Sequence, residues 1–136
     1  MPPEAHSAAS FHLEIDGISA GSFVRCRGLR ASVEVVEVRE GGSDQVRRLR
    51  GDTSWSSIVL ERGVARGGEL LQWFAEGRRR DGAVVLLAAD GREVSRWAFV
   101  RGWPCRWEGP ALDAHAPAVA LELLEISHEG LRCIER

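Results

Sequence analysis

Residues 32–42 read SVEVVEVREGG and continue as SDQVRRLRG through residue 51. The first half is rich in valine. Because strand side chains alternate between two faces, Val33 and Val35 share one face, and Val36 and Val38 share the other. Either a bulge between Val35 and Val36 shifts this alternation, or both faces of the strand are covered. The pattern predicts a strand over Ser32–Glu40.

The segment that follows this strand, Gly41–Ser54, is polar and shows no hydrophobic period. It is close to the roughly 12–15 residues beyond which a structureless loop is uncommon and often functional. Because fixing such a loop costs conformational entropy, we expect a binding partner to order it. The two-faced strand and this segment together favour a subunit built for assembly.

Length and composition are typical of one compact domain. The 136 residues suit a single core, which we expect over residues 11–136, after a short flexible lead-in over residues 1–10. The net charge of −2 gives no general attraction to nucleic acid or to an anionic membrane. All 18 basic side chains are arginine, a composition bias that also suits interfaces.

The sequence also indicates the cellular compartment in which we expect the chain to fold. No stretch of about 18 apolar residues occurs, which argues against a membrane-spanning helix. The first residues, MPPEAHSAAS, lack the charged and apolar regions of a signal peptide. Three widely spaced cysteines make a disulfide framework improbable, so we expect folding and assembly in a reducing cytoplasm.

Hydrophobic periodicity predicts a mainly β domain with one helix. The helix is expected over Glu69–Arg80, with Leu70, Leu71, Trp73 and Phe74 on one face and Gly82 ending it. Residues Trp103–Trp107 are expected to turn a corner. The other strands are expected over Phe11–Ile15, Gly21–Arg27, Trp55–Glu61, Ala83–Ala89, Glu93–Arg101 and Ala118–Ser127.

We find no pattern that predicts catalysis or a cofactor. Ser127, His128 and Glu129 have suitable chemistry, but consecutive strand residues point to opposite faces, so a polar strand end is favoured over a triad. The histidines and cysteines show no metal-ligand spacing, and no phosphate-binding glycine loop occurs. Trp73 is expected in the core, whereas Trp103 and Trp107 are expected to be exposed.

Several strands carry apolar side chains on both faces, which is more than a small free-standing sandwich can bury. Neighbouring copies could cover this surface, and closing strands from several copies into a barrel would also remove unpaired edges. The sequence therefore predicts self-assembly.

An ordered series of segments resembles the tail tube proteins of contractile phage tails and of related bacterial contractile injection systems. The series covers about Phe11 to Leu131 and consists of VEVVEVREGG, RLRGDTSW, IVLERGV, LLQWF, VVLLAADGREVSRWAFVRGWPCRW and AVALELLEISHEGL. The resemblance implies a β-sandwich or barrel-like subunit with one flanking helix. It does not separate a phage tail from an injection system, or a main tube subunit from a paralogue that initiates or caps the tube.

The resemblance also implies an assembly and its partners. Such subunits form hexameric rings that stack into a hollow inner tube, within a contractile sheath and between a baseplate with its spike and a capping protein. Strands from all subunits would line the lumen as one shared β-barrel, and the lumen would carry an effector or DNA as cargo. The complete particle could be released from the cell. The residues that we expect at inter-subunit or inter-ring contacts are Glu40, Gly41, Gly42, Arg47, Arg48, Arg50, Gly51 and Trp55.

Three alternatives stay open on the sequence alone. The segment 41–55 could be a solvated loop with no partner. The arginines 78–80 could be a solvated helix end, which we favour, or a contact for the sheath. The whole chain could be a nucleic-acid-binding β-barrel that uses Arg25, Arg27, Arg47, Arg48 and Arg50, although near-neutral charge disfavours this.

Overall fold

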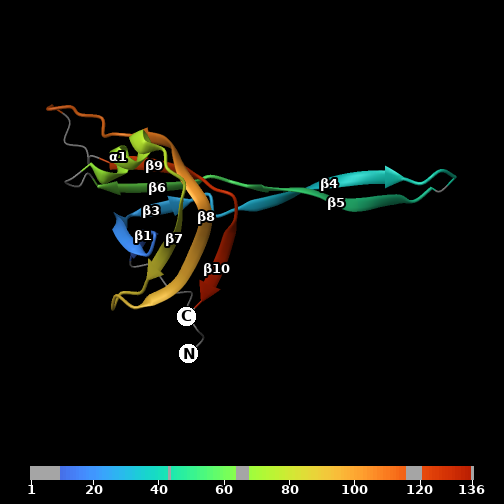
Figure 1. The fold of residues 1–136 in the computed structure, drawn as a ribbon, viewed down its shortest axis with the longest axis horizontal. Coiled ribbons are helices and arrows are strands. Elements are labelled where there is room, and N and C mark those ends of the chain that lie inside the picture. Colours follow the sequence, from blue (N-terminus) through green and yellow to red (C-terminus); the bar gives the residue numbers. More distant parts are fainter. Residues whose placement is uncertain (1–9, 43, 64–67, 116–120, 136) are drawn as a thin grey trace.

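The computed structural model describes residues 10–42, 44–63, 68–115 and 121–135. The lead-in expected over residues 1–10 lies, except for Ser10, outside this part of the chain. The described residues form a mainly β body with one short helix, and a long two-stranded arm projects from it (Figure 1). The elements are β1 (Ser10–Ile15), β2 (Ile18–Phe23), β3 (Arg25–Arg27), β4 (Ala31–Arg39), β5 (Val46–Trp55), β6 (Ile58–Gly63), α1 (Glu69–Glu76), β7 (Arg80–Leu87), β8 (Glu93–Glu108), β9 (Leu121–Ser127) and β10 (Leu131–Glu135).

The body is one antiparallel sheet that folds over on itself at β8. Strands β2, β1, β7, the first half of β8 and β10 form what we call the first leaf. The second half of β8, with β9, β6 and β3, forms the second leaf. β8 can serve both leaves because it is 16 residues long and is irregular between Pro104 and Arg106. The corner expected at Trp103–Trp107 is therefore confirmed, although the chain turns it within one continuous strand.

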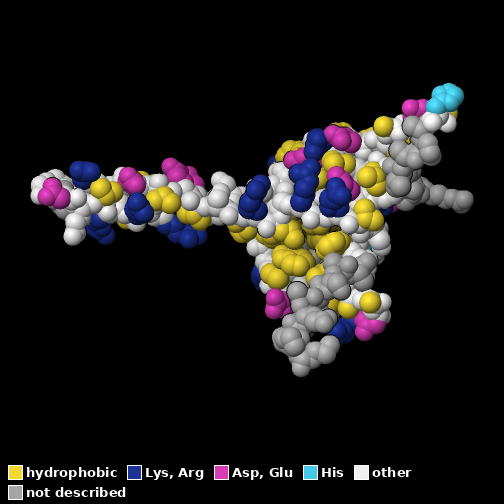
Figure 2. Space-filling view, turned by 180° about the vertical axis from the view of Figure 1, so that it is seen from behind, with side chains coloured by type: hydrophobic (Ala, Val, Ile, Leu, Met, Phe, Trp, Pro, Cys, Tyr) yellow, Lys and Arg dark blue, Asp and Glu magenta, His cyan; other side chains and the backbone are white. Residues whose placement is uncertain are grey.

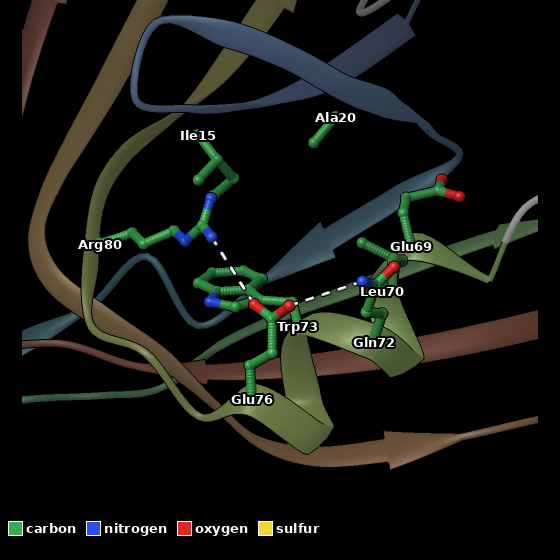
Figure 3. Close-up of a pocket in the computed structure, with 8 residues that line it drawn as sticks. All are labelled: Ile15, Ala20, Glu69, Leu70, Gln72, Trp73, Glu76 and Arg80. Carbon is green, nitrogen blue, oxygen red and sulfur yellow. Dashed lines mark hydrogen bonds and ion pairs between the residues drawn. The ribbon is translucent and has the colours of Figure 1, made fainter.

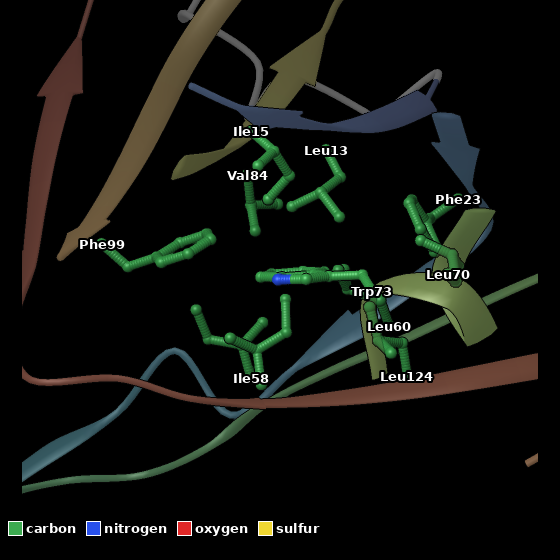
Figure 4. Close-up of a cluster of buried hydrophobic side chains, with 11 residues drawn as sticks. Leu13, Ile15, Phe23, Ile58, Leu60, Leu70, Trp73, Val84, Phe99 and Leu124 are labelled. Atoms are coloured by element: carbon green, nitrogen blue, oxygen red, sulfur yellow. The ribbon is translucent and has the colours of Figure 1, made fainter. Parts of the chain in front are cut away.

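The hydrophobic core lies between the two leaves and under the helix. Trp73 of α1 lies among side chains of both leaves, with Val84 and Leu13 on one side and Ile58 on the other (Figure 4). Burying aromatic and aliphatic side chains of this size contributes about 1.5–3 kcal/mol each. The core members are Leu13, Ile15, Phe23, Ile58, Leu60, Leu70, Trp73, Val84, Phe99, Leu124 and Ile126.

The helix is shorter than its sequence pattern predicts. It ends at Glu76 because Gly77 takes a left-handed conformation (φ 67°), and the Gly77 N–H donates to the carbonyl of Trp73 at 2.9 Å. The expected end at Arg80 and Gly82 is wrong, since Arg80 already belongs to β7. Of the four apolar helix residues, Leu70 and Trp73 are buried, whereas Leu71 and Phe74 are exposed.

Other strand boundaries also differ from the prediction. The strand expected over Gly21–Arg27 is two strands, because Val24 turns outward between them and is 70% exposed. β10 was not predicted at all. Trp107 packs against the core, so its expected exposure is wrong, and Trp103 is only half-exposed. Part of the strand expected over Ala118–Ser127 lies outside the described residues, and the described part is β9.

Candidate assembly interface

The arm consists of β4 and β5, which pair only with each other among the described strands. The loop expected over Gly41–Ser54 is therefore wrong for most of that range, because β5 covers Val46–Trp55. Period-two hydrophobicity marks a strand that buries one face against its own chain. β5 buries neither face in this way, so it carries no such period.

The two faces of the arm differ in chemistry. Val36 lies opposite Leu49, and Val38 lies opposite Arg47, so one face is largely apolar. The other face carries the opposing pairs Val35–Arg50, Glu37–Arg48 and Arg39–Val46, and is largely charged. Hydrophobic and charged side chains alternate along the whole arm in the space-filling view (Figure 2). Val35, Val36, Val38, Val46 and Leu49 are 37–63% exposed, which leaves apolar surface that this copy does not cover.

The alternation of side chains between the two faces of β4 is not interrupted between Val35 and Val36, where the sequence suggested a bulge. The irregularity lies between Val33 and Val35, where Gly51 and Asp52 on β5 oppose Glu34 alone. The extra residue thus belongs to β5, and the bulge expected between Val35 and Val36 is wrong. A side chain at Gly51 would meet the Glu34 Cβ at 3.0 Å and the Val36 side chain at 3.1 Å, which explains the glycine.

Ion pairs within the arm engage two of the three arginines expected at an interface. Arg47 Nη1 lies 2.9 Å from Glu40 Oε1, and Arg48 Nε lies 3.6 Å from Glu37 Oε1. Arg50 makes no ion pair with any described residue. It is therefore the arginine of this set that has a guanidinium available for a carboxylate on another molecule.

The root of the arm is held by His128, a residue whose role the sequence did not predict. His128 is 8% exposed, and its Nε2–H donates to the Ser56 carbonyl at 3.0 Å. The Gly130 N–H donates to Nδ1 at 3.2 Å, which fits the tautomer with its proton on Nε2. The Trp55 ring centroid lies 6.0 Å from that of His128. These contacts place the expected site residue Trp55 at the junction between arm and body.

The edges of the first leaf are a second feature suited to assembly. β2 and β10 are its outer strands, and each pairs with only one strand along its length in the described part of the chain. In the second leaf the outer strand β3 is only three residues long, and β8 contacts α1. Unpaired edges are templates for strand addition by another chain. The first leaf is therefore the one that can continue from copy to copy.

A hollow of about 260 Å³ lies between α1 and the β1–β2 hairpin (Figure 3). Arg80 enters it and lies 3.6 Å from both Asp16 and Glu76. Its Nε atom is buried there without a hydrogen-bond partner among the described residues. The described lining contains no serine, cysteine or histidine, and its two carboxylates, Glu69 and Glu76, lie in ion pairs with Arg62 and Arg80.

Other candidates for chemistry have structural roles. Both ring nitrogens of His128 contact backbone groups, so a triad with Ser127 and Glu129 is not assembled. Burial raises the pKa of the Cys26 thiol to about 11, which leaves it protonated and unreactive. Among the described residues, no group of three or more potential ligands could hold a metal ion.

Three of the five arginines considered for nucleic-acid binding already lie beside carboxylates. Arg25 lies 3.2 Å from Glu61, and Arg47 and Arg48 have the carboxylate partners given above. A phosphate backbone would have to displace these carboxylates. The single helix of the described chain, α1, is far too short to cross a membrane.

Comparisons with solved structures find the same fold in proteins of contractile machines. One match, from the sheath–tube complex of an extracellular contractile injection system named PVC, has a TM-score of 0.86 and 18% identity, and covers 99% of this chain and 95% of that one. A match from the baseplate of the anti-feeding prophage has a TM-score of 0.78 and 26% identity, covering 99% and 98%. Hcp1 from Salmonella typhimurium has a TM-score of 0.60 and 16% identity, covering 91% and 84%. Curated protein sequences gave no match.

The model of one protein family covers nearly the whole sequence. It matches residues 7–132 and is described as T4-like virus tail tube protein gp19. The mainly β fold with one flanking helix, implied by the resemblance of the sequence, is confirmed by the structural matches. This chain therefore belongs to the T4-like virus tail tube protein gp19 family, and it is a structural subunit of a tube.

Proposed function

We propose that this chain, with residues 11–136 as one domain, builds the inner tube of a contractile tail or injection machine. Copies would close into hexameric rings, and the rings would stack into a hollow conduit. The observation that carries this proposal is the arm, which leaves the body with apolar side chains exposed on both strands. A two-stranded hairpin is marginally stable at best in water, so another copy must cover it.

The open edges of the first leaf supply a route to the ring. If β10 of one copy pairs with β2 of the next, the first leaf continues around the ring and closes as a barrel without edges. The core and the second leaf occupy one side of this barrel wall, so the other side would line the lumen. Such a head-to-tail contact closes by rotation. The 26% identical neighbour comes from a six-fold symmetrised particle, which supports six copies per ring.

The arm would make the contact between rings. Its length carries it beyond the body (Figure 1), and its apolar face would pack on a copy in the adjacent ring. Arg50 would then pair with a carboxylate of that copy, and Glu40, Gly41, Gly42, Arg47, Arg48, Gly51 and Trp55 would shape or position the contact. Arg–carboxylate pairs are directional, so this contact would fix the rotation between rings.

The partners follow from this role. A sheath, a baseplate with its spike and a terminating cap would contact the tube, and the matched structures include a sheath–tube complex, a baseplate and a tube-terminating cap. Assembly would take place in the cytoplasm, before any release of the particle. The subunit would act mechanically, as a rigid conduit for cargo, without a covalent step.

The test is a variant with a short arm. Val36 and Leu49 are already cross-strand partners, so replacing residues 37–48 by Asn-Gly closes the hairpin directly after them with a turn that suits two-residue loops. We expect a folded body that forms rings or small oligomers but no long tubes in electron micrographs, whereas the parent protein forms tubes.

A matched control separates arm length from arm charge. Arg39→Gln, at an exposed arm residue outside the set named above, removes one charge of the arm and leaves its length and apolar face intact, so tubes should still form. Long tubes built from the short-armed variant would refute the proposed role of the arm. A parent protein that stays monomeric at high concentration, even with sheath and baseplate partners, would refute the proposed function as a whole.

A further inference from the structure

The inference concerns the face of the first leaf that points away from the core, and it rests on the proposed function, which places this face on the lumen. Strand register identifies its members, because directly opposed residues point to the same side. Glu14 opposes Ala83, which opposes Ala98, and Val85 opposes both His12 and Arg96. On β10, Arg132 opposes Ala98. We call this surface the lumen face; its centre is small, apolar and almost fully covered, with Ala83 3% and Val85 0% exposed, and the charged side chains lie around it.

One arginine of the lumen face is held between two carboxylates. Arg96 donates to both oxygens of Glu14, a forked contact in which one N–O distance is 3.2 Å. It also donates to both oxygens of Glu93, with N–O distances of 2.7 and 3.3 Å. The side chains of Glu14, Arg96 and Glu93 are only 18–23% exposed. These carboxylates come from different strands, so the fold holds the triad across the leaf.

The triad cancels the positive charge of the face. Glu14 and Glu93 balance Arg96 and Arg132, the latter of which has no ion pair with any described residue. Hydrogen bonds to Glu93 and then Glu14 raise the pKa of Arg96, which keeps its guanidinium charged and paired. A guanidinium that already makes forked bonds to two carboxylates has few donors left for a phosphate.

We propose that Glu14 and Glu93 keep the lumen wall neutral, so that the conduit passes a polypeptide cargo without retaining nucleic acid. Without these carboxylates, every copy in every ring would present Arg96 and Arg132 to the lumen. Closely spaced guanidiniums bind phosphate backbones with release of counterions, and a strand held in this way would stay in the tube. A polypeptide that carries both signs of charge has no comparable attraction to the paired wall.

The experiment measures DNA retention in assembled tubes. Tubes of the parent protein and of the double variant Glu14→Gln, Glu93→Gln are formed in the presence of fluorescent single-stranded DNA, treated with nuclease and washed. We expect the parent tubes to protect no DNA above background. The double variant should protect about tenfold more or better at low salt, and the gain should disappear as salt is raised.

Two matched controls isolate the charge on the lumen face. Arg106 lies between Glu108 at 2.7 Å and Glu125 at 3.0 Å, a similar triad on the second leaf and outside the proposed lumen. Glu108→Gln with Glu125→Gln should leave nuclease-protected DNA at the parent level. The triple variant Glu14→Gln, Glu93→Gln, Arg96→Gln removes the freed charge and should return retention towards that level. Glu93→Gln alone keeps the Glu14 contact and should give an intermediate gain.

The outcomes are distinct. Nuclease-protected DNA in parent tubes would overturn the inference, and so would tubes of the double or single variant that retain no more DNA than the parent. The inference would also be overturned if the Glu108→Gln, Glu125→Gln control retained as much DNA as the Glu14→Gln, Glu93→Gln variant. The freed arginine charge would then bind DNA outside the lumen. Failure of the parent protein to form tubes would count against the proposed function itself, which micrographs of the same samples reveal.

Discussion

At the scale of single residues, buried Arg62 connects the helix to the second leaf. Its Nε donates to Glu122 Oε1 at 2.8 Å, and its Nη2 donates to Glu69 Oε1 at 2.8 Å. Trp107 Nε1 donates to the second oxygen of Glu122 at 2.7 Å. Burial alone would lower the pKa of Arg62, but the hydrogen bonds to Glu122 and Glu69 outweigh it and raise this pKa. The charge of Arg62 is thus kept and compensated inside the protein.

This network predicts a large effect for one substitution. Glu122→Ala would leave Arg62 charged and buried, with its carboxylate partner Glu69 on the more exposed side of the helix. We expect the free energy of unfolding to fall by about 3–5 kcal/mol, as for other broken buried pairs. Glu108→Ala, which breaks a contact between exposed side chains, should change it by no more than about 1 kcal/mol. Urea unfolding of both variants measures these changes. Equal losses of the free energy of unfolding would show that the buried network contributes no more than the exposed contact.

At the scale of elements, the sequence predicted those that bury side chains within one chain. The apolar run Ala83–Ala89 is β7, and Val84 and Val85 are both completely buried in it. The pattern of Leu70 and Trp73 likewise placed the helix on the core. β10 escaped detection because LRCIE carries weak alternation, and β5 because its covering surface belongs to another molecule in our account. Hydrophobic periodicity reflects burial within one chain, so it does not mark a strand whose side chains would be buried only after assembly.

The arm supplies the prediction at this scale. Val36 and Leu49 face each other across the arm and are 37% and 44% exposed. If another copy covers this apolar face, Val36→Ser with Leu49→Ser removes apolar surface that is still exposed in one copy and buried in the assembly. We expect unchanged thermal unfolding of the body, whose core contains neither residue, together with shorter tubes or a higher concentration for tube formation. Light scattering during assembly measures this, and tubes that form normally would place the apolar face in solvent.

At the scale of the whole molecule, two features make one copy incomplete. The first leaf ends in unpaired strands on both sides, and the arm stands clear of the body (Figure 1). The sequence predicted this incompleteness from valines on both faces of residues 32–40, and three of them, Val35, Val36 and Val38, are exposed. It could not locate the arm root at His128 or the Arg96 triad, because both depend on residues brought together from distant strands. Such contacts leave no local pattern.

The central claim is that another copy covers the arm. Hydrogen exchange of the arm amides tests this claim most directly. In the dilute protein, backbone amides over β4 and β5 should exchange fast compared with those of β7, because an uncovered hairpin opens readily. In assembled tubes, the same amides should become protected to the level of the core strands. Arm amides that exchange equally fast in both states, in samples that micrographs show to be tubes, would contradict the account.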